Sequence, residues 1–207
     1  MGEKRLAYNL SMPRTSLFLS GDAKADALLA KTALALVIGM VLDQQVPMEK
    51  AFSGPAELER RLGRPLDAAR IAAMDPDKLV ELFTTRPSLH RFPGSMAARV
   101  QKVCRVIADE YDNDASNIWT GAADGRELMA RVKALPGFGE QKARIFVALL
   151  GKRLGVSAPG WEEASSPYGE PGSFRSVADI VDADSLARVR QFKQAAKASA
   201  KAGAQRR

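Results

Sequence analysis

Apolar residues recur at helical spacing along most of this 207-residue chain, and this periodicity constrains the fold more than any other feature. The clearest example begins at Ser95, which we expect to cap a helix. One face of that helix is predicted to carry Met96, Val100, Val103, Ile107 and Tyr111. Strict alternation of apolar and polar residues, which is typical of a half-buried strand, does not recur in the sequence. The chain is therefore predicted to be all-α.

Helix-start signals and further apolar stripes predict the other helices. Asp75 and Pro76 form a cap and first-turn pair, Pro47 suits a first turn, Asp124 opens another helix, and Gly63 closes one. The expected helices are residues 22–42, 47–52, 55–62, 77–83, 126–135 and 140–154, followed by a last helix from Asp184.

Two segments depart from this pattern. Residues 156–176 are rich in proline and glycine and are predicted to form a long loop, which in a compact domain is often functional. Residues 196–207 are basic and carry small side chains, so we expect a flexible tail.

The amino-acid composition limits the binding partners and cofactors that we expect for this chain. The chain has 31 Lys and Arg against 24 Asp and Glu, a net charge of +7, so its surface should attract polyanions. One cysteine, Cys104, excludes a disulfide within the chain, and with one histidine, His90, it is too few for a zinc set or an iron–sulfur cluster. We therefore expect no metal and no cofactor.

The sequence also predicts a cytoplasmic protein with no membrane partner. Its start, MGEKRLAYNL, lacks the apolar core of a secretory signal. The longest apolar run, residues 33–42, is about half of the roughly 20 residues that cross a bilayer.

Residues 135–144, LPGFGEQKAR, place a glycine turn between two amphipathic segments. Gly137 and Gly139 permit positive φ and leave no Cβ in the way of an approaching group. Their N–H groups, with the positive end of the following helix, would form a nest for one phosphate, and Lys142 and Arg144 would add positive charge. The alternative is an ordinary turn between helices, but the amphipathic segments on both sides favour phosphate binding.

The motif LPGFGEQKA resembles the hairpin of the helix–hairpin–helix (HhH-GPD) superfamily of base-excision DNA glycosylases. A second segment upstream, VLDQQVPMEKAF, resembles a segment of the alkyl-base branch of that superfamily, and the order and separation of the two segments also fit. The resemblance implies a two-lobed helical bundle with double-stranded DNA crossing the cleft between the lobes. It also implies a monomer that is associated with the nucleoid.

The implied unit covers residues 1–195. One lobe, a helical barrel of about residues 30–155, would contain the hairpin at residues 126–154. Residues 1–29 and 156–195 would form the second lobe.

The resemblance also implies which residues meet the DNA. Gln44 and Gln45 would offer amide groups to an orphaned or flipped base, and their alternative role is a polar end to a buried helix. The residues expected to contact DNA are Gln44, Gln45, His90, Gly137, Phe138, Gly139, Gln141 and Lys142. The aromatic residues able to stack on a flipped base are Trp161 and Tyr168, which we place in the base pocket, and Phe92 and Trp119.

His90 is included because it lies in a loop between Arg86 and Arg91. A histidine there can contact a phosphate or orient a water molecule. A structural role is the alternative.

One departure from the family pattern concerns strand cleavage. Lyase-type members carry a Schiff-base lysine at the second residue after the last glycine of the hairpin, where this chain has Gln141. Lys142 is one step further and is turned by about 100° on the helix, so it does not simply inherit that role. The resemblance therefore implies a monofunctional glycosylase that hydrolyses the N-glycosidic bond of a damaged base without cleaving the strand.

A second departure concerns the catalytic carboxylate, which stabilises an oxocarbenium-like transition state and orients water. Counting from the hairpin places Pro159 at its expected position. We rank Asp179 first as its replacement and Asp43 second, ahead of Glu162 and Glu163 in the long loop. The alternative roles are a helix cap for Asp179, a helix-end charge for Asp43 and solvated loop charges for the glutamates.

A catalytically inactive module that recognises bent or lesioned DNA in the same cleft is the competing hypothesis. Pro159 favours this module, whereas the glutamine pair and the aromatic residues of the long loop favour the enzyme. Structured RNA is the alternative ligand.

Overall fold

The computed structural model describes residues 16–204, with side chains described as far as residue 199. These residues form eleven α-helices and one short 3-10 helix, and they contain no strand. The predicted all-α fold is therefore confirmed.

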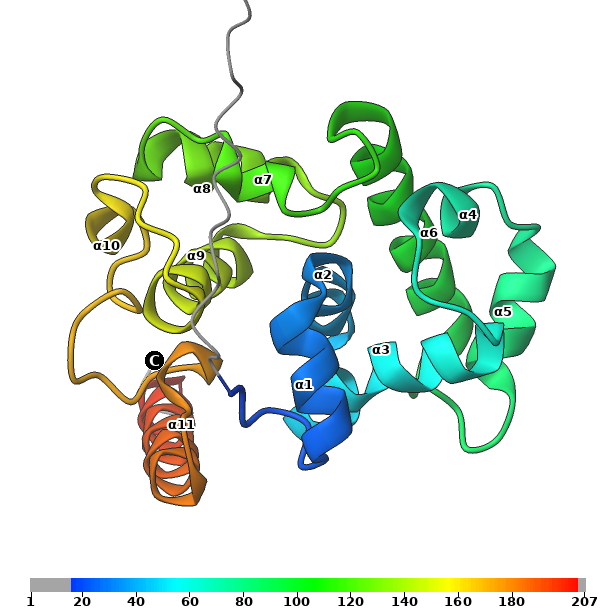
Figure 1. The fold of residues 1–207 in the computed structure, drawn as a ribbon. Helices are drawn as coiled ribbons and strands as arrows, with labels where there is room; N and C mark the ends of the chain where they lie inside the picture. Colours follow the sequence, from blue (N-terminus) through cyan, green and yellow to red (C-terminus); the bar gives the residue numbers. More distant parts are fainter. Residues whose placement is uncertain (1–15, 205–207) are drawn as a thin grey trace, which may run out of the picture.

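The helices pack as two groups (Figure 1). The first group comprises α1 (Ala23–Lys31), α2 (Ala33–Leu42), α3 (Met48–Leu62), α4 (Ala68–Ala72), α5 (Pro76–Thr84) and α6 (Pro93–Glu110). The second group comprises α7 (Asn117–Thr120), α8 (Gly125–Ala134), α9 (Glu140–Leu154), α10 (Trp161–Ala164), η1 (Val177–Asp179) and α11 (Ala183–Ala204).

One hydrophobic core extends through both groups, and α2 lies at its centre. All residues from 34 to 42 are buried, as the uniformly apolar sequence of this helix requires. The boundary between the groups falls between α6 and α7, not near residue 155. The hairpin helices α8 and α9 pack against α10 and η1, which follow them in the chain, so the predicted division into lobes differs from the observed packing.

The predicted helix at residues 22–42 is two helices, bent by 116° at Thr32. Thr32 is extended (φ −119°, ψ 106°), and its N–H donates to the Leu28 carbonyl to end α1. The break lets α2, which is apolar on every side, run through the core while α1 stays at the surface with its exposed residues. A straight helix would either bury the exposed residues of α1 or expose the apolar residues of α2.

The two short helices predicted at residues 47–52 and 55–62 are a single helix, α3. Pro55 lies inside it and is buried, although proline removes one backbone hydrogen bond and costs about 3 kcal/mol in a helix interior. The preceding Gly54 allows close packing, because a Cβ there would lie 2.5 Å from Leu42 Cδ1. Burial of this stretch against α2 keeps the helix continuous. Pro47 precedes the first turn instead of lying in it.

Local helix signals were otherwise reliable. Asp75 accepts hydrogen bonds from the N–H groups at the start of α5, Asp124 caps α8, and Gly63 ends α3 with φ 65°. The stripe predicted on α6 is confirmed, with Met96, Val100, Val103 and Ile107 buried and Tyr111 half-buried. However, α6 begins at Pro93, so Ser95 is not its cap.

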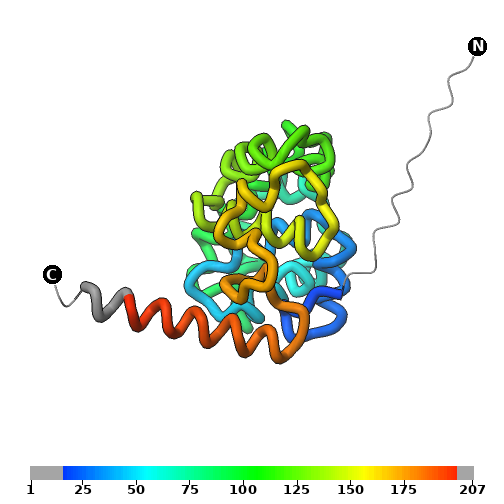
Figure 2. The backbone as a smooth tube through the Cα atoms, turned by 90° about the vertical axis from the view of Figure 1, so that its left-hand side faces the viewer, coloured from blue at the N-terminus to red at the C-terminus, as the bar shows by residue number. Residues whose placement is uncertain are grey.

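The long loop at residues 156–176 contains the short helix α10. Residues 196–204 of the predicted flexible tail continue α11, which ends at Ala204. Figure 2 shows α11 leaving the body of the protein as a single helix. The rest of the predicted tail, residues 205–207, and the start of the predicted second lobe, residues 1–15, lie outside the described residues.

Within the described residues, no single helix is both long and apolar enough to cross a membrane. Only α1 and α2 taken together reach that length and composition, and they are the bent pair.

Candidate functional site

The two motifs singled out in the sequence lie against each other. We call residues 43–46 the glutamine turn and residues 135–139 the hairpin turn. Lys142, at the start of α9, donates from Nζ to the carbonyl oxygens of Met40 (2.7 Å) and Val41 (3.4 Å) at the end of α2. These carbonyls lack partners within the helix, so the lysine caps α2. The hairpin helix is thereby fixed to the segment that leads into the glutamine turn.

Arg99 of α6 provides a second connection between the turns. Its Nη1 donates a hydrogen bond to Gln44 Oε1. Its aliphatic part packs on Gly137, where an added Cβ would lie only 2.7 Å from Arg99 Cδ. Sequence reasoning missed Arg99, because in the sequence it is one of several basic residues on α6 and its partners are distant in the chain.

His90 is fully buried and is hydrogen-bonded to the backbone of the glutamine turn. Its Nε2 donates to the Gln44 carbonyl oxygen (2.9 Å), and its Nδ1 accepts from the Phe92 N–H (3.0 Å). Burial lowers the pKa of the imidazole, so the neutral form is favoured. The structure thus places His90 beneath the glutamine turn and not at the surface, which favours the structural role given as the alternative to DNA contact.

The two glutamines have different environments. Gln44 is half-buried and fixed by Arg99 and His90, whereas Gln45 is exposed. Gln45 has φ 56°, a left-handed conformation that costs a non-glycine residue about 1–3 kcal/mol. Such strain is retained where the surroundings impose it, and it projects Gln45 from an otherwise rigid turn.

The hairpin turn differs in detail from the expectation. Gly137 has φ 93°, but Gly139 has φ −79°, so only the first glycine uses a positive φ. An added Cβ on Gly139 would meet nothing within 4 Å, so this residue faces open space. Phe138, which was expected to contact DNA, is buried and packs against Phe146 with ring centroids 5.5 Å apart. Its side chain anchors the turn in the core.

Three helices begin at this site without a side-chain cap in the described structure: α3, α6 and α9. The first follows the glutamine turn directly, the second starts three residues after His90, and the third starts at the hairpin turn. Aspartates cap α1, α4, α5 and α8, whereas α2, α7 and α10 also begin without a side-chain cap. Uncapped N-termini carry unpaired N–H groups and partial positive charge, so the site is suited to anions.

Asp43 places one carboxylate among these positive groups. It is half-buried, and its desolvation raises the pKa of the carboxyl, while the charges of Lys193 and Lys142 oppose that rise. Burial in turn lowers the pKa of Lys142 to about 8, with Asp43 opposing the shift. The glutamine turn thus combines a carboxylate with nearby cations.

Asp179 lies in a different setting, in η1. Its side chain is 3% exposed and forms an ion pair with Lys152 at 2.6 Å. It also accepts from Arg175 N (2.8 Å), Ser176 N (3.0 Å) and Ser173 Oγ (3.1 Å). These bonds occupy both carboxylate oxygens, so the structure supports the capping role that was the alternative for Asp179.

The predicted base-pocket residues also make structural contacts. Trp161 lies flat against α9 at Gly151, where a Cβ would be 2.5 Å from three of its ring atoms. The hydroxyl of Tyr168 accepts a hydrogen bond from Gln141 Nε2 at 2.8 Å, which ties the side chain of Gln141 to the long loop. None of these contacts involves the glutamine turn.

Among the other aromatic candidates, Trp119 is buried against Phe146. Phe92 is 42% exposed and adjoins His90, with the Arg91 guanidinium 4.8 Å from its ring centroid. It is the candidate aromatic residue that the structure places beside the glutamine turn.

Pro159 and Gly160 pack closely against the N-terminus of α8. The Pro159 carbonyl accepts from Gly125 N at 2.7 Å, and a Cβ on Gly125 would lie 2.5 Å from the backbone of Gly160. This contact lies at the end of α8 that is opposite the hairpin turn. Glu162 and Glu163 follow it and are exposed, as expected for solvated loop charges.

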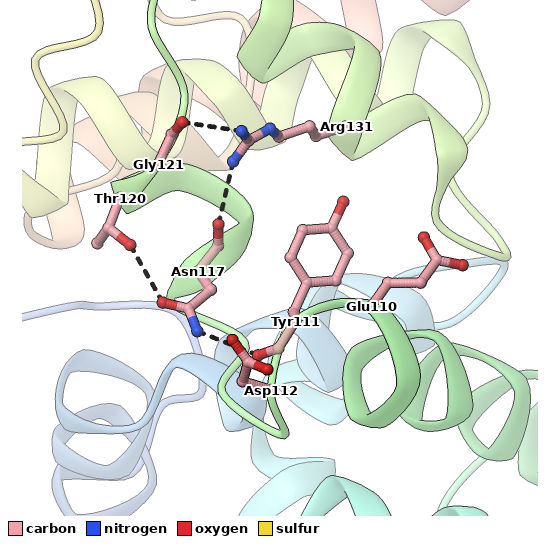
Figure 3. Close-up of a pocket in the computed structure, with 7 residues that line it drawn as sticks. All are labelled: Glu110, Tyr111, Asp112, Asn117, Thr120, Gly121 and Arg131. Atoms are coloured by element: carbon pink, nitrogen blue, oxygen red, sulfur yellow. Dashed lines mark hydrogen bonds between the residues drawn. The ribbon is translucent and has the colours of Figure 1, made fainter.

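An open pocket of about 490 Å³ lies elsewhere, between the end of α6, α7 and α8. Figure 3 shows Asn117 bonded to the Tyr111 carbonyl and Arg131 donating to the carbonyls of Asn117 and Gly121. Its polar groups are thus largely bonded to one another and to the backbone. None of the residues predicted to act on a ligand lines it, so it is not the candidate site.

Comparison with known protein families gives one match. A family model described as HhH-GPD superfamily base excision DNA repair protein matches residues 38–204. The match includes both the glutamine turn and the hairpin turn. No curated protein and no solved structure matches the chain.

Proposed function

Because the chain belongs to the HhH-GPD superfamily of base excision DNA repair proteins, we propose that it is a monofunctional DNA glycosylase acting on double-stranded DNA. Membership of a DNA repair family implies DNA binding. The proposal adds the reaction, hydrolysis of the N-glycosidic bond of a damaged base.

The observation that carries the proposal is that Lys142 and Arg99 connect the hairpin turn to the glutamine turn, from which the exposed, strained Gln45 projects. A phosphate would bind at the N-terminus of α9, where Gly139 leaves the approach open. Lys142 and Arg99 hold the two turns at a fixed separation. Gln45 would then enter the duplex at the extruded nucleotide, since a base inside the stack is out of reach.

Asp43 is the carboxylate that we propose for catalysis, ahead of Asp179. Breaking the glycosidic bond builds positive charge on the sugar, which a fixed carboxylate stabilises while it orients the attacking water. Asp43 adjoins Gln45, and the lysine charges around it oppose the pKa rise caused by burial. The oxygens of Asp179 are already bonded to Lys152, Ser173 and backbone N–H groups.

The way in which two side chains are held supports the proposed absence of strand cleavage. Lys142 donates to two backbone carbonyls, and Gln141 is bonded to Tyr168. An amine nucleophile must be free to reach the sugar, whereas the Nζ of Lys142 is bonded at the end of α2. We therefore expect base release to leave the strand intact.

Incubation with duplexes that carry uracil, alkylated purines, 8-oxoguanine or deaminated purines, followed by hot alkali, tests the proposal. We expect strand scission of at least one duplex, and only after alkali. Scission without alkali would contradict the monofunctional assignment, and no scission of any duplex would contradict the glycosylase.

A catalytically inactive module that binds lesioned DNA is the second candidate, favoured by Pro159 at the position where the family's carboxylate is expected. It predicts tight binding to a damaged duplex with no alkali-labile product. Gel-shift measurements on the same duplexes separate the two candidates.

A further inference from the structure

The first turns of α11 anchor this helix to the body. Val189 is buried, Arg190 forms an ion pair with Glu49 of α3, and the guanidinium of Arg175 lies 5.5 Å from the ring centroid of Phe192. Residues 191–199 are all exposed, and Figure 2 shows this part of α11 running out alone. These contacts therefore fix the direction of the helix where it leaves the body of the protein.

The sequence of the outer part of α11 favours a helix. Residues 193–204 are rich in alanine, the residue with the highest helix propensity, and they continue a helix already nucleated at the root. At about 1.5 Å per residue, the helix extends roughly 20 Å beyond Arg190. It is thus an arm of defined direction.

The basic residues of this arm lie on one side. At about 100° per residue, Lys193 and Lys197 fall within about 60° of Arg190, whereas Ser199 falls on the opposite side. We call Arg190, Lys193 and Lys197 the basic stripe. Residues 191–207 contain no Asp or Glu, so no acidic side chain within the arm offsets this charge.

The stripe faces the candidate site. Its first member, Arg190, bonds to Glu49, which lies in the first turn of α3 just after the glutamine turn. Its second member, Lys193, is close enough to Asp43 for its charge to lower the pKa of that carboxyl. Lys197 continues the same line outward, so the stripe extends the positive surface of the site into open space.

We infer that α11 is a clamp for duplex DNA, whose basic stripe binds backbone phosphates to one side of the lesion. The inference rests on the proposed function and adds a surface to it. Arg190 and Lys197 are separated by about 10 Å along the helix, which is about three base-pair steps. Beyond the Arg190–Glu49 ion pair, the stripe continues with exposed lysines and no apolar face, which suits a phosphate backbone more than a peptide or a bilayer.

Photo-crosslinking tests this inference with probes at matched positions. Lys197→Cys and Ser199→Cys place a benzophenone on opposite sides of α11, and Gln45→Cys places one at the site itself. The native Cys104 is buried and does not compete for the label. With a damaged duplex of about 30 base pairs, we expect crosslinking from position 197 at least fivefold above that from position 199, and located several base pairs to one side of the lesion.

Equal yields from positions 197 and 199, or no crosslink from 197 while Gln45→Cys crosslinks, would overturn the clamp and leave the proposed function intact. No crosslink from any position would instead contradict the proposed DNA interface. Retention on anionic phospholipid vesicles through position 197, without crosslinking to the duplex, would assign the stripe to a membrane and overturn the clamp.

Salt dependence provides a second measurement on unlabelled protein. Lys193→Gln with Lys197→Gln should reduce the slope of log K against log salt by about 2, because each phosphate contact contributes about 0.9. Lys78→Gln with Lys102→Gln removes the same charge from exposed lysines outside α11 and should leave the slope nearly unchanged. Equal effects of the two double variants would show that only net charge matters, which would overturn the clamp.

Discussion

The ammonium group of Lys142 donates a 2.7 Å hydrogen bond to the carbonyl oxygen of Met40, 102 residues earlier in the chain. This bond joins the helix that follows the hairpin turn to the helix that ends at the glutamine turn. The position of the hairpin turn is therefore coupled to the position of Gln45 on the glutamine turn. Together with Arg99, it explains how two short motifs far apart in the sequence form one site.

Lys142→Met should destabilise the protein, because it leaves two carbonyls of α2 without their charged donor while keeping the aliphatic packing. The expected loss is about 1–3 kcal/mol in the free energy of unfolding, measured by chemical denaturation. Duplex affinity should fall as well, since the turns lose their fixed separation. Lys78→Met, at an exposed position on α5, is the control. Unchanged stability and affinity in Lys142→Met would show that this bond does not organise the site.

The two hairpin glycines should respond differently to alanine. Gly139 has an ordinary φ of −79° and open space around its Cβ, so Gly139→Ala should fold normally yet lose several-fold in duplex affinity. Gly137→Ala should lose stability as well, because its φ of 93° and the nearby Arg99 side chain both oppose a Cβ. Circular dichroism and fluorescence anisotropy provide the two measurements. Parent-like binding by Gly139→Ala would exclude phosphate binding at this residue.

Gln45→Gly should distinguish the effect of Gln45 on stability, which comes from its backbone strain, from its effect on base release. Glycine tolerates the positive φ, so the variant should be more stable than the parent by about 1 kcal/mol. It should nevertheless lose base release, because no amide enters the duplex. Fluorescence of 2-aminopurine next to the lesion reports base extrusion directly, and we expect a smaller increase with the variant. A variant that is no more stable but extrudes bases as well as the parent would remove both arguments for Gln45.

Stability should depend on the titration of His90, the only histidine in the chain. Burial lowers its pKa in the folded protein, so the unfolded chain binds the proton more readily. The stabilising contribution is fully present above the unfolded pKa of about 6.5 and is lost as pH falls through that value toward the folded pKa. Unfolding measured between pH 5 and 8 should show this decline in the parent. His90→Gln should be less stable at pH 8 and should lack this component, and an identical pH profile would contradict the assignment.

The sequence predicted those features that depend on neighbouring residues. The Asp75 and Asp124 caps, the Gly63 terminus and the α6 stripe need only a few consecutive positions, and all four are present. The break at Thr32 and the continuity of α3 through Pro55 arise instead from burial in the assembled core, which no local signal encodes.

The candidate site shows the same difference between local features, which the sequence predicts, and long-range contacts, which it does not. Its location was predicted from two motifs, but the roles of single residues depended on distant partners. His90 was expected at the surface and is buried beneath Gln44, a contact across 46 residues. Arg99 was overlooked because its partner, Gln44, is 55 residues away. Asp179 was chosen for its place before a helix, and its ion pair with Lys152 cannot be read from that place.

The catalytic assignment depends on a comparison of two carboxylates. Asp43→Asn should retain binding to a damaged duplex but reduce base release by about 10²–10⁴-fold, the effect of removing a positioned acid–base group. Single-turnover kinetics at saturating protein measure this loss separately from affinity.

Asp179→Asn should behave in the opposite way. Removing one partner of a buried ion pair leaves the Lys152 ammonium uncompensated, so the free energy of unfolding should fall by about 3 kcal/mol or more. The folded fraction should still release the base at a rate near that of the parent, because no bond of Asp179 reaches the glutamine turn. Both variants must therefore be assayed below their melting temperatures and at matched folded concentration. If Asp179→Asn abolishes release in the folded protein while Asp43→Asn does not, the carboxylate in η1 is the catalytic one, and the cleft must extend from the glutamine turn to Lys152.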